Sequence, residues 1–280
     1  MSERSGPRDG ELPVIDGEVA HEARVYDFLL GGGDNFDVDR KAAEAHGRAV
    51  GGIENSRHAV RANRRFLGRA IRYLAAEAGI RQFLDLGSGI PTRDNVHEVA
   101  QRIAPGSRVI YVDYDPIVMA HAHTLVNGTT EGATAYLLAD MRDVELILRD
   151  AAAIVDFSQP VAVMFVSMLH FLPDDEDPHA LVRRYLDRLA SGSFLVVSHV
   201  AADIQPDAMA ALADTTARDN SIDYDFHPRS RVEVARFFNG LDLVDPGMVQ
   251  IDDWRPEDPL PPPPPGGGDP PFHSGVGRKP

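Results

Sequence analysis

RQFLDLGSGIPT, residues 81–92, joins a short apolar strand, 83–86, to a turn that contains two glycines. An apolar run of this length is typical of a strand that is buried on both faces of a parallel sheet. Gly87 and Gly89 have no Cβ, so the turn after the strand can bring its backbone close to a ligand. In an open α/β sheet, nucleotide-like ligands bind outside the carboxyl end of such a strand.

Apolar segments alternate with helical patterns through residues 80–200. Strands are expected over 83–86, 108–113, 133–138, 161–167 and 194–199, and helices over 93–103, 116–126, 144–153 and 178–190. Strands rich in Val, Ile and Leu between helices are typical of a parallel sheet covered on both faces. The predicted fold class is therefore α/β, a Rossmann-like doubly wound sheet. Two further strands, 241–244 and 248–251, are expected to close it as an antiparallel hairpin and to bring the total to seven.

The chain on either side of this sheet divides into three further segments. Residues 1–18 are polar and are expected to be a flexible N-terminus. Residues 19–79 have three helical patterns separated by glycines, which predicts an N-terminal helical cover for a ligand-binding domain at 80–256. Residues 257–280 include five consecutive prolines and three glycines, so we predict a disordered Pro/Gly-rich tail.

The composition restricts which binding partners and which cellular location are expected. The formal net charge of −15 argues against a surface that neutralises phosphates, so no nucleic-acid partner is expected. The N-terminus lacks an apolar signal segment and no apolar run is long enough to span a bilayer, so we expect no membrane partner and a cytoplasmic location. The chain has no Cys, and His121 and His123 would point to different faces of a helix, so no metal site is predicted.

The residues around the glycine turn discriminate between ligands. A dinucleotide site requires G-x-G-x-x-G, but Thr92 occupies the third glycine position and Pro91 lies within the turn. Asp85 precedes Gly87 by two residues. Its carboxylate would repel a pyrophosphate but attract a cationic amino-acid group, such as the ammonium of S-adenosylmethionine (SAM).

Polar residues at the ends of the next strands support the same ligand. Asp113 ends the second strand, where a carboxylate can accept hydrogen bonds from two ribose hydroxyls. After the third strand, Asp140 can bind an adenine amino group and Met141 offers an apolar surface to the ring. The fourth strand runs into Ser167 and His170 at the same edge of the sheet.

With these residues the chain resembles the class I SAM-dependent methyltransferases. It is most similar to an actinobacterial family of them that was long classed as a domain of unknown function. The resemblance is carried by ARVYDFLLGGGDNF (23–36), RANRRFL (61–67), 82–101, 109–118, 170–178, 229–238 and the region near Trp254. It implies the fold and SAM as cofactor, with Asp85 and the glycines at the methionine part, Asp113 at the ribose, and Asp140 with Met141 at the adenine.

The resemblance also implies that the helical cover contributes to the cofactor site, through Tyr26, Asp34, Asn35, Arg61 and Asn63. The cofactor-binding residues are predicted to be Asp85, Gly87, Ser88, Gly89, Asp113, Tyr114, Asp140, Met141, Ser167, Arg61 and Asn63.

The predicted reaction is methyl transfer from SAM to a small-molecule acceptor. His170 is the first candidate for a general base, with Tyr26 and His199 after it, because His170 follows the fourth strand. A structural role for His170, with its ring bonded to a backbone carbonyl, is an equal alternative. A non-catalytic regulatory protein that binds SAM or S-adenosylhomocysteine (SAH) also stays open, whereas Thr92 and Asp85 disfavour a dinucleotide oxidoreductase. The sequence is compatible with a homodimer as well as with a monomer.

Overall fold

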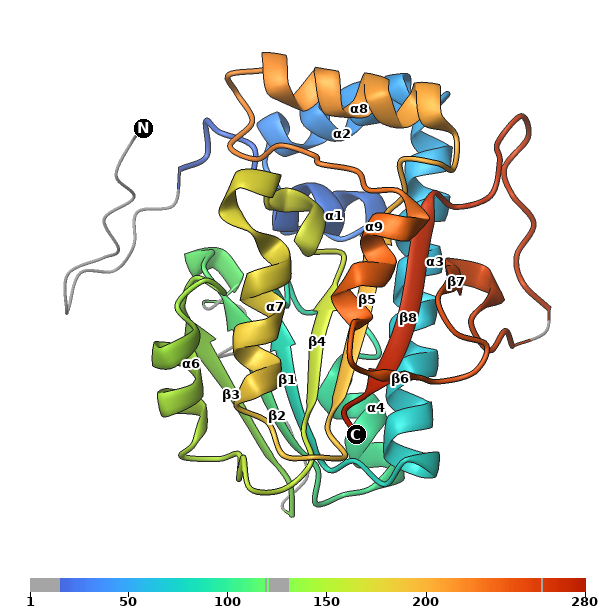
Figure 1. The fold of residues 1–280 in the computed structure, drawn as a ribbon. Coiled ribbons are helices and arrows are strands. Elements are labelled where there is room, and N and C mark those ends of the chain that lie inside the picture. The colour runs from blue at the N-terminus through green and yellow to red at the C-terminus, as the bar shows by residue number, and fades with distance from the viewer. Residues whose placement is uncertain (1–15, 119, 121–130, 258) are drawn as a thin grey trace.

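The computed structural model describes residues 16–118, 120, 131–257 and 259–280, and these contain a sheet of eight strands. The strand order is β3-β2-β1-β4-β5-β8-β6, with β7 paired to β8 (Figure 1). The strands are β1 (Gln82–Leu86), β2 (Arg108–Asp113), β3 (Ala133–Leu138), β4 (Ala162–Val166), β5 (Phe194–Val200), β6 (Asp242–Leu243), β7 (Val249–Gln250) and β8 (Phe272–Arg278). β1 to β5 are parallel and β8 is antiparallel to β5, which confirms the doubly wound α/β class.

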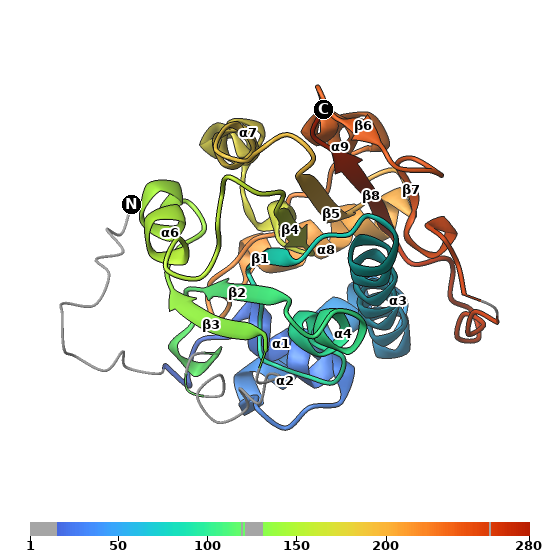
Figure 2. The same ribbon diagram turned by 90° about the horizontal axis from the view of Figure 1, so that it is seen from below.

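Helices cover both faces of the sheet because alternate side chains of each buried strand point to opposite faces. In β1, Phe83 belongs to the core cluster beneath α3 (Ile53–Arg72) and α4 (Val96–Ile103). Leu84 and Leu86 belong to the opposite cluster, beneath α6 (Val144–Ala151), α7 (Pro178–Asp187) and α9 (Arg231–Ala235). Figure 2 shows the two groups of helices on the two faces of the sheet.

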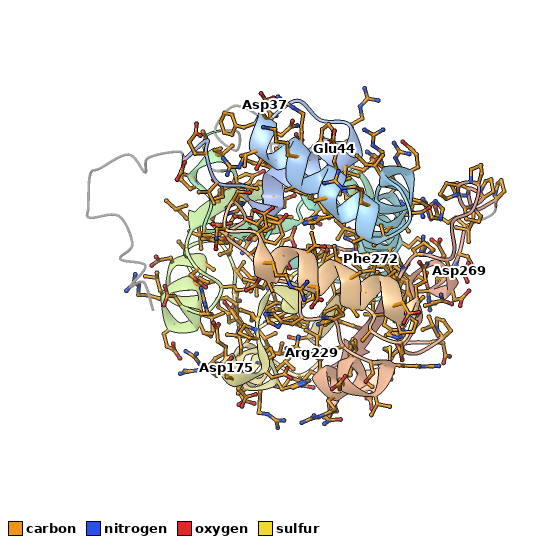
Figure 3. All side chains as sticks on the ribbon, turned by 90° about the horizontal axis from the view of Figure 1, so that it is seen from above. Asp37, Glu44, Asp175, Arg229, Asp269 and Phe272 are labelled. Carbon is orange, nitrogen blue, oxygen red and sulfur yellow. The ribbon has the colours of Figure 1, made fainter. Side chains whose placement is uncertain are left out.

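A third group of helices lies over the carboxyl ends of the strands (Figure 1). It contains α1 (Glu22–Leu30), α2 (Asp37–Ala49) and α8 (Pro206–Arg218). Figure 3, seen from above, shows α2 and α8 lying side by side. Residues 219–226 return beneath them, where Ile222 forms a β-bridge with Ala20. The cover therefore includes residues beyond 19–79.

The short irregular helices connect these elements. They are η1 (Tyr73–Glu77), η2 (Leu169–Phe171), η3 (Asp174–Glu176), η4 (Arg236–Phe238) and η5 (Ile251–Asp253). Part of the helix expected over 116–126 lies outside the described part of the chain. His121 and His123 lie outside it as well. Within the described ranges, no helix combines the length and the apolar character needed to cross a membrane.

The C-terminal residues correct two predictions. The tail predicted to be disordered contains β8, which lies between β5 and β6 and pairs along its whole length with β5. The predicted hairpin does not form, because β6 and β7 each pair with β8 rather than with each other. The sheet therefore has eight described strands instead of the seven expected.

The glycines of β8 explain why its sequence, FHSGVGR, gives little sign of a strand. A Cβ at Gly277 would lie 2.9 Å from Cδ1 of Phe238, and one at Gly275 would lie 3.1 Å from Cζ of the same ring. Glycine is required at both positions because the Phe238 ring packs directly on the backbone of the strand. Gly275 and Gly277 thus allow the Phe238 ring to pack on β8, and the same two glycines lower the β-propensity of its sequence.

Substitution of Val276 tests whether β8 is part of the core. Val276 is fully buried opposite Val196, so Val276→Asp should lower the free energy of unfolding by more than about 3 kcal/mol, because it buries an unpaired charge. Val232→Asp is the matched control, since Val232 is 75% exposed, and its effect should stay within about 0.5 kcal/mol. Chemical denaturation measures both. Equal stabilities of the two variants would show that β8 is not integral to the fold.

Candidate functional site

The turn after β1 lies where the sheet order reverses, between β1 and β4. Gly87 and Gly89 have φ angles of 74° and 64°, which residues with a Cβ rarely adopt. Gly87 is also in close contact with Met168, because a Cβ there would lie 2.2 Å from the Met168 Sδ. The backbone N–H of Gly87 donates to the Val112 carbonyl at 2.8 Å. The turn is therefore held against β2 with its glycines facing a cavity.

Cavity A lies between this turn and the cover and has a volume of about 70 Å³. It is lined by predicted residues from five separate parts of the chain, namely Tyr26, Asn63, Asp85, Gly87, Ser88, Gly89, Asp113 and Ser167. Arg64, Glu22, Met168 and Phe171 also line it. The hydroxyl of Ser88 is buried and has no hydrogen-bond partner. Such a group indicates space for a polar ligand.

Asp85 is 6% exposed, and no described residue donates a hydrogen bond to its carboxylate. Burial raises the pKa of Asp85 to about 7, Arg64 opposes this rise, and the neighbouring carboxylate of Asp113 adds to it. An ionised Asp85 is therefore compensated only in part, by the charge of Arg64, and has no hydrogen-bond donor among the described residues. A cationic ligand in cavity A would supply one.

Asp113, at the end of β2, has its two oxygens oriented by backbone donors. Oδ2 accepts from the N–H of Gly89 at 2.8 Å, and Oδ1 accepts from the N–H of Asp115 at 3.0 Å. Burial raises the pKa of Asp113 to about 6, although these two hydrogen bonds lower it. The carboxylate is fixed at the boundary of cavity A and a larger neighbouring cavity.

That neighbouring space, cavity B, has a volume of about 450 Å³. The predicted residues Tyr114, Asp140 and Met141 line it together with Gly87 and Asp113. Tyr114 donates to Oε1 of Glu22 at 2.6 Å. Both oxygens of Asp140 accept from Arg142, at 2.9 Å and 2.5 Å, and Arg142 also bonds Glu176. Asp140 is therefore already engaged in an ion pair at the mouth of this cavity.

A hydrogen-bond chain connects the cover to the sheet above cavity A. Asn63 donates to the Tyr26 hydroxyl at 2.9 Å, and Tyr26 donates to the Val60 carbonyl at 3.1 Å. The Asn63 carbonyl accepts from the Ser198 hydroxyl at 2.6 Å, which in turn accepts from the N–H of Ser167 at 2.9 Å. The chain fixes α1 and α3 relative to the ends of β4 and β5.

Cavity C, of about 100 Å³, lies beyond this chain, under α1, α2 and α8. Tyr26 and Ser167 line both cavities A and C, and Glu22 and Phe171 line all three. His170 lines cavity C, where its ring stacks on Phe226 with centroids 5.4 Å apart. Burial lowers the pKa of His170 well below its ordinary value, and His199 and Arg229 lower it further. His170 is therefore neutral at pH 7.

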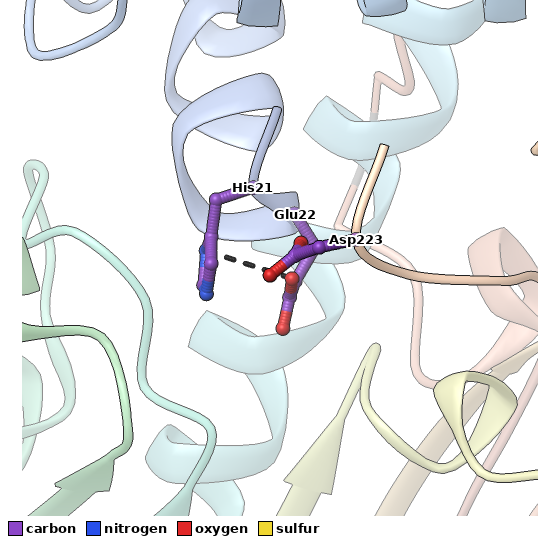
Figure 4. Close-up of side chains that lie close together, drawn as sticks. All are labelled: His21, Glu22 and Asp223. Carbon is purple, nitrogen blue, oxygen red and sulfur yellow. Dashed lines mark ion pairs between the residues drawn. The ribbon is translucent and has the colours of Figure 1, made fainter. Parts of the chain in front are cut away.

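A cluster of His21, Glu22 and Asp223 joins the start of α1 to the returning segment 219–226 (Figure 4). One ligand atom from each lies within 4.8 Å of the others. Burial lowers the pKa of His21, but the carboxylates of Glu22, Asp115 and Asp223 raise it by more. His21 Nδ1 lies 3.3 Å from the N–H of Ala23, from which the neutral ring accepts as an N-cap, and 3.2 Å from Asp115, with which the protonated ring pairs instead. These contacts support an ion-paired joint between the cover and the sheet.

The structure brings most predicted site residues together, with a few exceptions. Arg61 is exposed and lines none of the three cavities, whereas Arg64 on the same helix lines cavity A. Asp34 and Asn35 lie at the far end of α1 and also line none of them. Both ring nitrogens of His199 contact protein atoms, the Val200 carbonyl at 2.7 Å and Arg229 at 3.0 Å.

Sequence reasoning missed Glu22, Arg64 and Phe171. Arg64 had no signal in the sequence, because the side of α3 that lines cavity A, with Asn63 and Leu67, is defined only when the helix packs on the sheet. Glu22 had none either, since its position at the meeting of the three cavities depends on how α1 packs on the sheet.

The chain matches, over residues 9–280, a family model described as S-adenosyl methyltransferase. It is similar to the crystal structure of a DUF574 family protein from Streptomyces avermitilis, with 40% identity, 95% of this chain and 99% of that chain covered, and a TM-score of 0.87. It is also similar to a proposed methyltransferase from Thermobifida fusca, with 39% identity, coverages of 94% and 96%, and a TM-score of 0.83. No significant match is found among curated proteins.

The unusual pKa of Asp85 predicts a pH-dependent stability. Because the pKa is raised on folding, to about 7 from 3.8, the folded protein loses stability as pH rises towards and through 7. Asp85→Asn should therefore be more stable than the wild type at pH 8, by on the order of 4 kcal/mol, with a smaller gain at pH 5. Denaturation at the two pH values measures the difference.

Asp187→Asn provides the control for this pH series, because Asp187 is an exposed residue of α7 and its substitution should leave the difference between the two pH values unchanged. A stability gain in Asp85→Asn that is the same at pH 5 and pH 8 would contradict the burial of an ionisable carboxylate.

Proposed function

The chain belongs to the S-adenosyl methyltransferase family, and we propose that it transfers a methyl group from SAM in cavities A and B to a small molecule in cavity C. One observation carries this proposal: the buried, unpartnered Asp85 faces the same cavity as the glycine turn and Asp113. No match favours a non-catalytic protein that only binds SAM or SAH.

The residues of cavity A fit the amino-acid end of SAM. Asp85 would accept hydrogen bonds from the ammonium group, because its carboxylate is buried without a donor. Arg64, which also lines cavity A, would pair with the carboxylate of the same end. The orphan hydroxyl of Ser88 and the open backbone of Gly89 complete this part of the site.

The residues of cavity B fit the nucleoside end. Asp113 would accept hydrogen bonds from the ribose hydroxyls, since its two oxygens are oriented by backbone N–H groups. Met141 would pack on the adenine ring, and Tyr114 lies beside it in the same cavity. Asp140 would reach the adenine amino group only by sharing its oxygens with Arg142.

Cavity C would hold the acceptor. Tyr26, Ser167 and Phe171 form the boundary between it and cavity A, so a molecule in cavity C lies next to the cofactor. SAM supplies, when bound, an electrophilic methyl group on a sulfonium. The cover excludes water and aligns the acceptor, which is the main contribution a protein makes to such a displacement.

His170 is the proposed group for orienting the acceptor. Its ring is neutral and its Nδ1 accepts from the N–H of Val200 at 3.5 Å, so the ring proton is on Nε2, which has no hydrogen-bond partner among the described residues. The low pKa makes the ring a weak base, so we assign to it a modest contribution, in which Nε2–H donates a hydrogen bond that orients the acceptor. The hydroxyl of Tyr26 is less available, because it is bonded to both Val60 and Asn63.

Removal of the carboxylate of Asp113 tests the cofactor site. Asp113→Ala should weaken the binding of SAH by about tenfold to a hundredfold, because hydrogen bonds from the ribose to a charged acceptor are lost. Calorimetry measures the affinity, and circular dichroism verifies the fold. Asp187→Ala on the exposed side of α7 is the control. An unchanged affinity in Asp113→Ala would remove the ribose assignment.

Turnover tests the activity itself. Wild-type protein incubated with methyl-labelled SAM and a metabolite extract should transfer label to a low-mass product, and His170→Ala should reduce the rate by about tenfold to a hundredfold while SAH affinity stays constant. Mass spectrometry identifies the product. Tight SAH binding without any labelled product would instead support a regulatory protein, and an unaffected rate in His170→Ala would show that the histidine is structural.

A further inference from the structure

Two polar side chains that line cavity C are buried and have no hydrogen-bond partner. They are Nε2 of His46, in a residue that is 4% exposed, and the hydroxyl of Tyr224, in a residue that is 8% exposed. An unsatisfied buried polar group costs about 1–3 kcal/mol, so such groups are rare unless a ligand satisfies them. Both groups therefore indicate hydrogen bonds to a molecule in this cavity.

The two groups belong to one aromatic wall. The His46 ring contacts Tyr224 edge-on with centroids 5.9 Å apart, and contacts Phe226 in the same way at 5.5 Å. Phe226 stacks on His170 on its other side. His46 comes from α2, whereas Tyr224 and Phe226 come from the segment after α8, so the wall forms only when the cover is assembled. Flat aromatic surfaces of this kind favour a planar ligand.

The charge of cavity C excludes anionic acceptors. No Lys or Arg is among its described lining residues, and the charged groups that line it are the acids Glu22 and Asp269. Burial lowers the pKa of His46 to about 4, so its ring is neutral at pH 7, as is that of His170. A carboxylate or phosphate in this cavity would be buried without a cation.

The size of cavity C limits the acceptor to no more than one ring. Its volume is about 100 Å³, less than the volume of about 150 Å³ of an apolar protein cavity that holds benzene, so even a single ring requires side chains of the wall to move outward. The walls are predominantly apolar, with Val25, Leu29, Met209, Leu212 and Phe272 among them.

We infer that the acceptor is a small, uncharged, single-ring compound with a hydrogen-bonding substituent, which Tyr224 and His46 recognise. The inference rests on the proposed function for its link to catalysis, but the binding site stands on the two orphan groups. Tyr224 also lines cavity B, so it lies between the acceptor and the cofactor cavities. Tyr224 and His46 thereby determine which acceptors bind and the orientation in which they bind.

Binding of three single-ring probes to the SAH-loaded protein tests this inference. Phenol, benzoate and benzylammonium have similar sizes and differ in charge. At pH 7.5, titration calorimetry should show saturable binding of phenol and at least about tenfold weaker binding of benzoate, since benzoate would bury an unpaired charge. Benzylammonium should also bind more weakly than phenol, because the cation must be desolvated and Glu22 already interacts with Tyr114 and His21. Tighter binding of benzylammonium than of phenol would overturn the uncharged class.

Two variants connect the binding to the orphan groups. Tyr224→Phe and His46→Phe each keep a ring and remove its polar atoms, so each should weaken phenol binding about fivefold to tenfold. His46 lines cavity C and neither of the other two, so His46→Phe should leave SAH affinity unchanged. Tyr73→Phe is the control, because Tyr73 lies at the end of α3 away from all three cavities.

The outcomes separate the inference from the proposed function. Absence of phenol binding, equal binding of benzoate, or unchanged phenol affinity in both variants would overturn the inference while leaving cofactor binding intact. Failure of the wild-type protein to bind SAH would contradict the proposed function before any probe is added.

Discussion

Two buried carboxylates at neighbouring strand ends impose the main constraint on this structure. Asp85 and Asp113 share cavity A, and burial raises the pKa of each, to about 7 and about 6. Groups of this kind reduce the stability of a folded protein at neutral pH unless a cation or a set of donors compensates them. The backbone N–H groups of Gly89 and Asp115 compensate Asp113, whereas Asp85 has no such donors. Its place in the fold is explained by a cationic ligand.

The rest of the chain keeps that ligand site closed and rigid. The hydrogen bonds from Tyr26 through Asn63 to Ser198 fix the cover on the sheet, and the ion-paired His21 fixes the start of α1. β8 completes the sheet beside β5, and the residues before it line cavity C. The C-terminal residues therefore contribute both to the core and to the proposed acceptor site.

Much of the fold and of the candidate site could be predicted because the information is local. The strand 83–86, the glycines after it and an acid at the end of each of the first three strands indicate a doubly wound sheet and its crevice without long-range contacts. β8 could not be predicted, because Gly275 and Gly277 lower its β-propensity and the contact with Phe238 that explains these glycines, like the pairing with β5, comes from residues far away in the sequence. The same holds for Glu22 and Tyr224, whose roles arise where distant segments pack together. Arg61 was preferred to Arg64 because a one-dimensional motif does not show which side of α3 faces the sheet.

Proton release on cofactor binding tests the central claim most directly. If the SAH ammonium pairs with Asp85, binding must ionise a carboxyl group that is mostly protonated at pH 6.5, so protons are released at that pH and hardly any at pH 8.5. Calorimetric titrations in two buffers of different ionisation enthalpy count those protons. The account predicts a substantial fraction of one proton at pH 6.5, lost in Asp85→Asn. Binding with the same proton count at both pH values would contradict it.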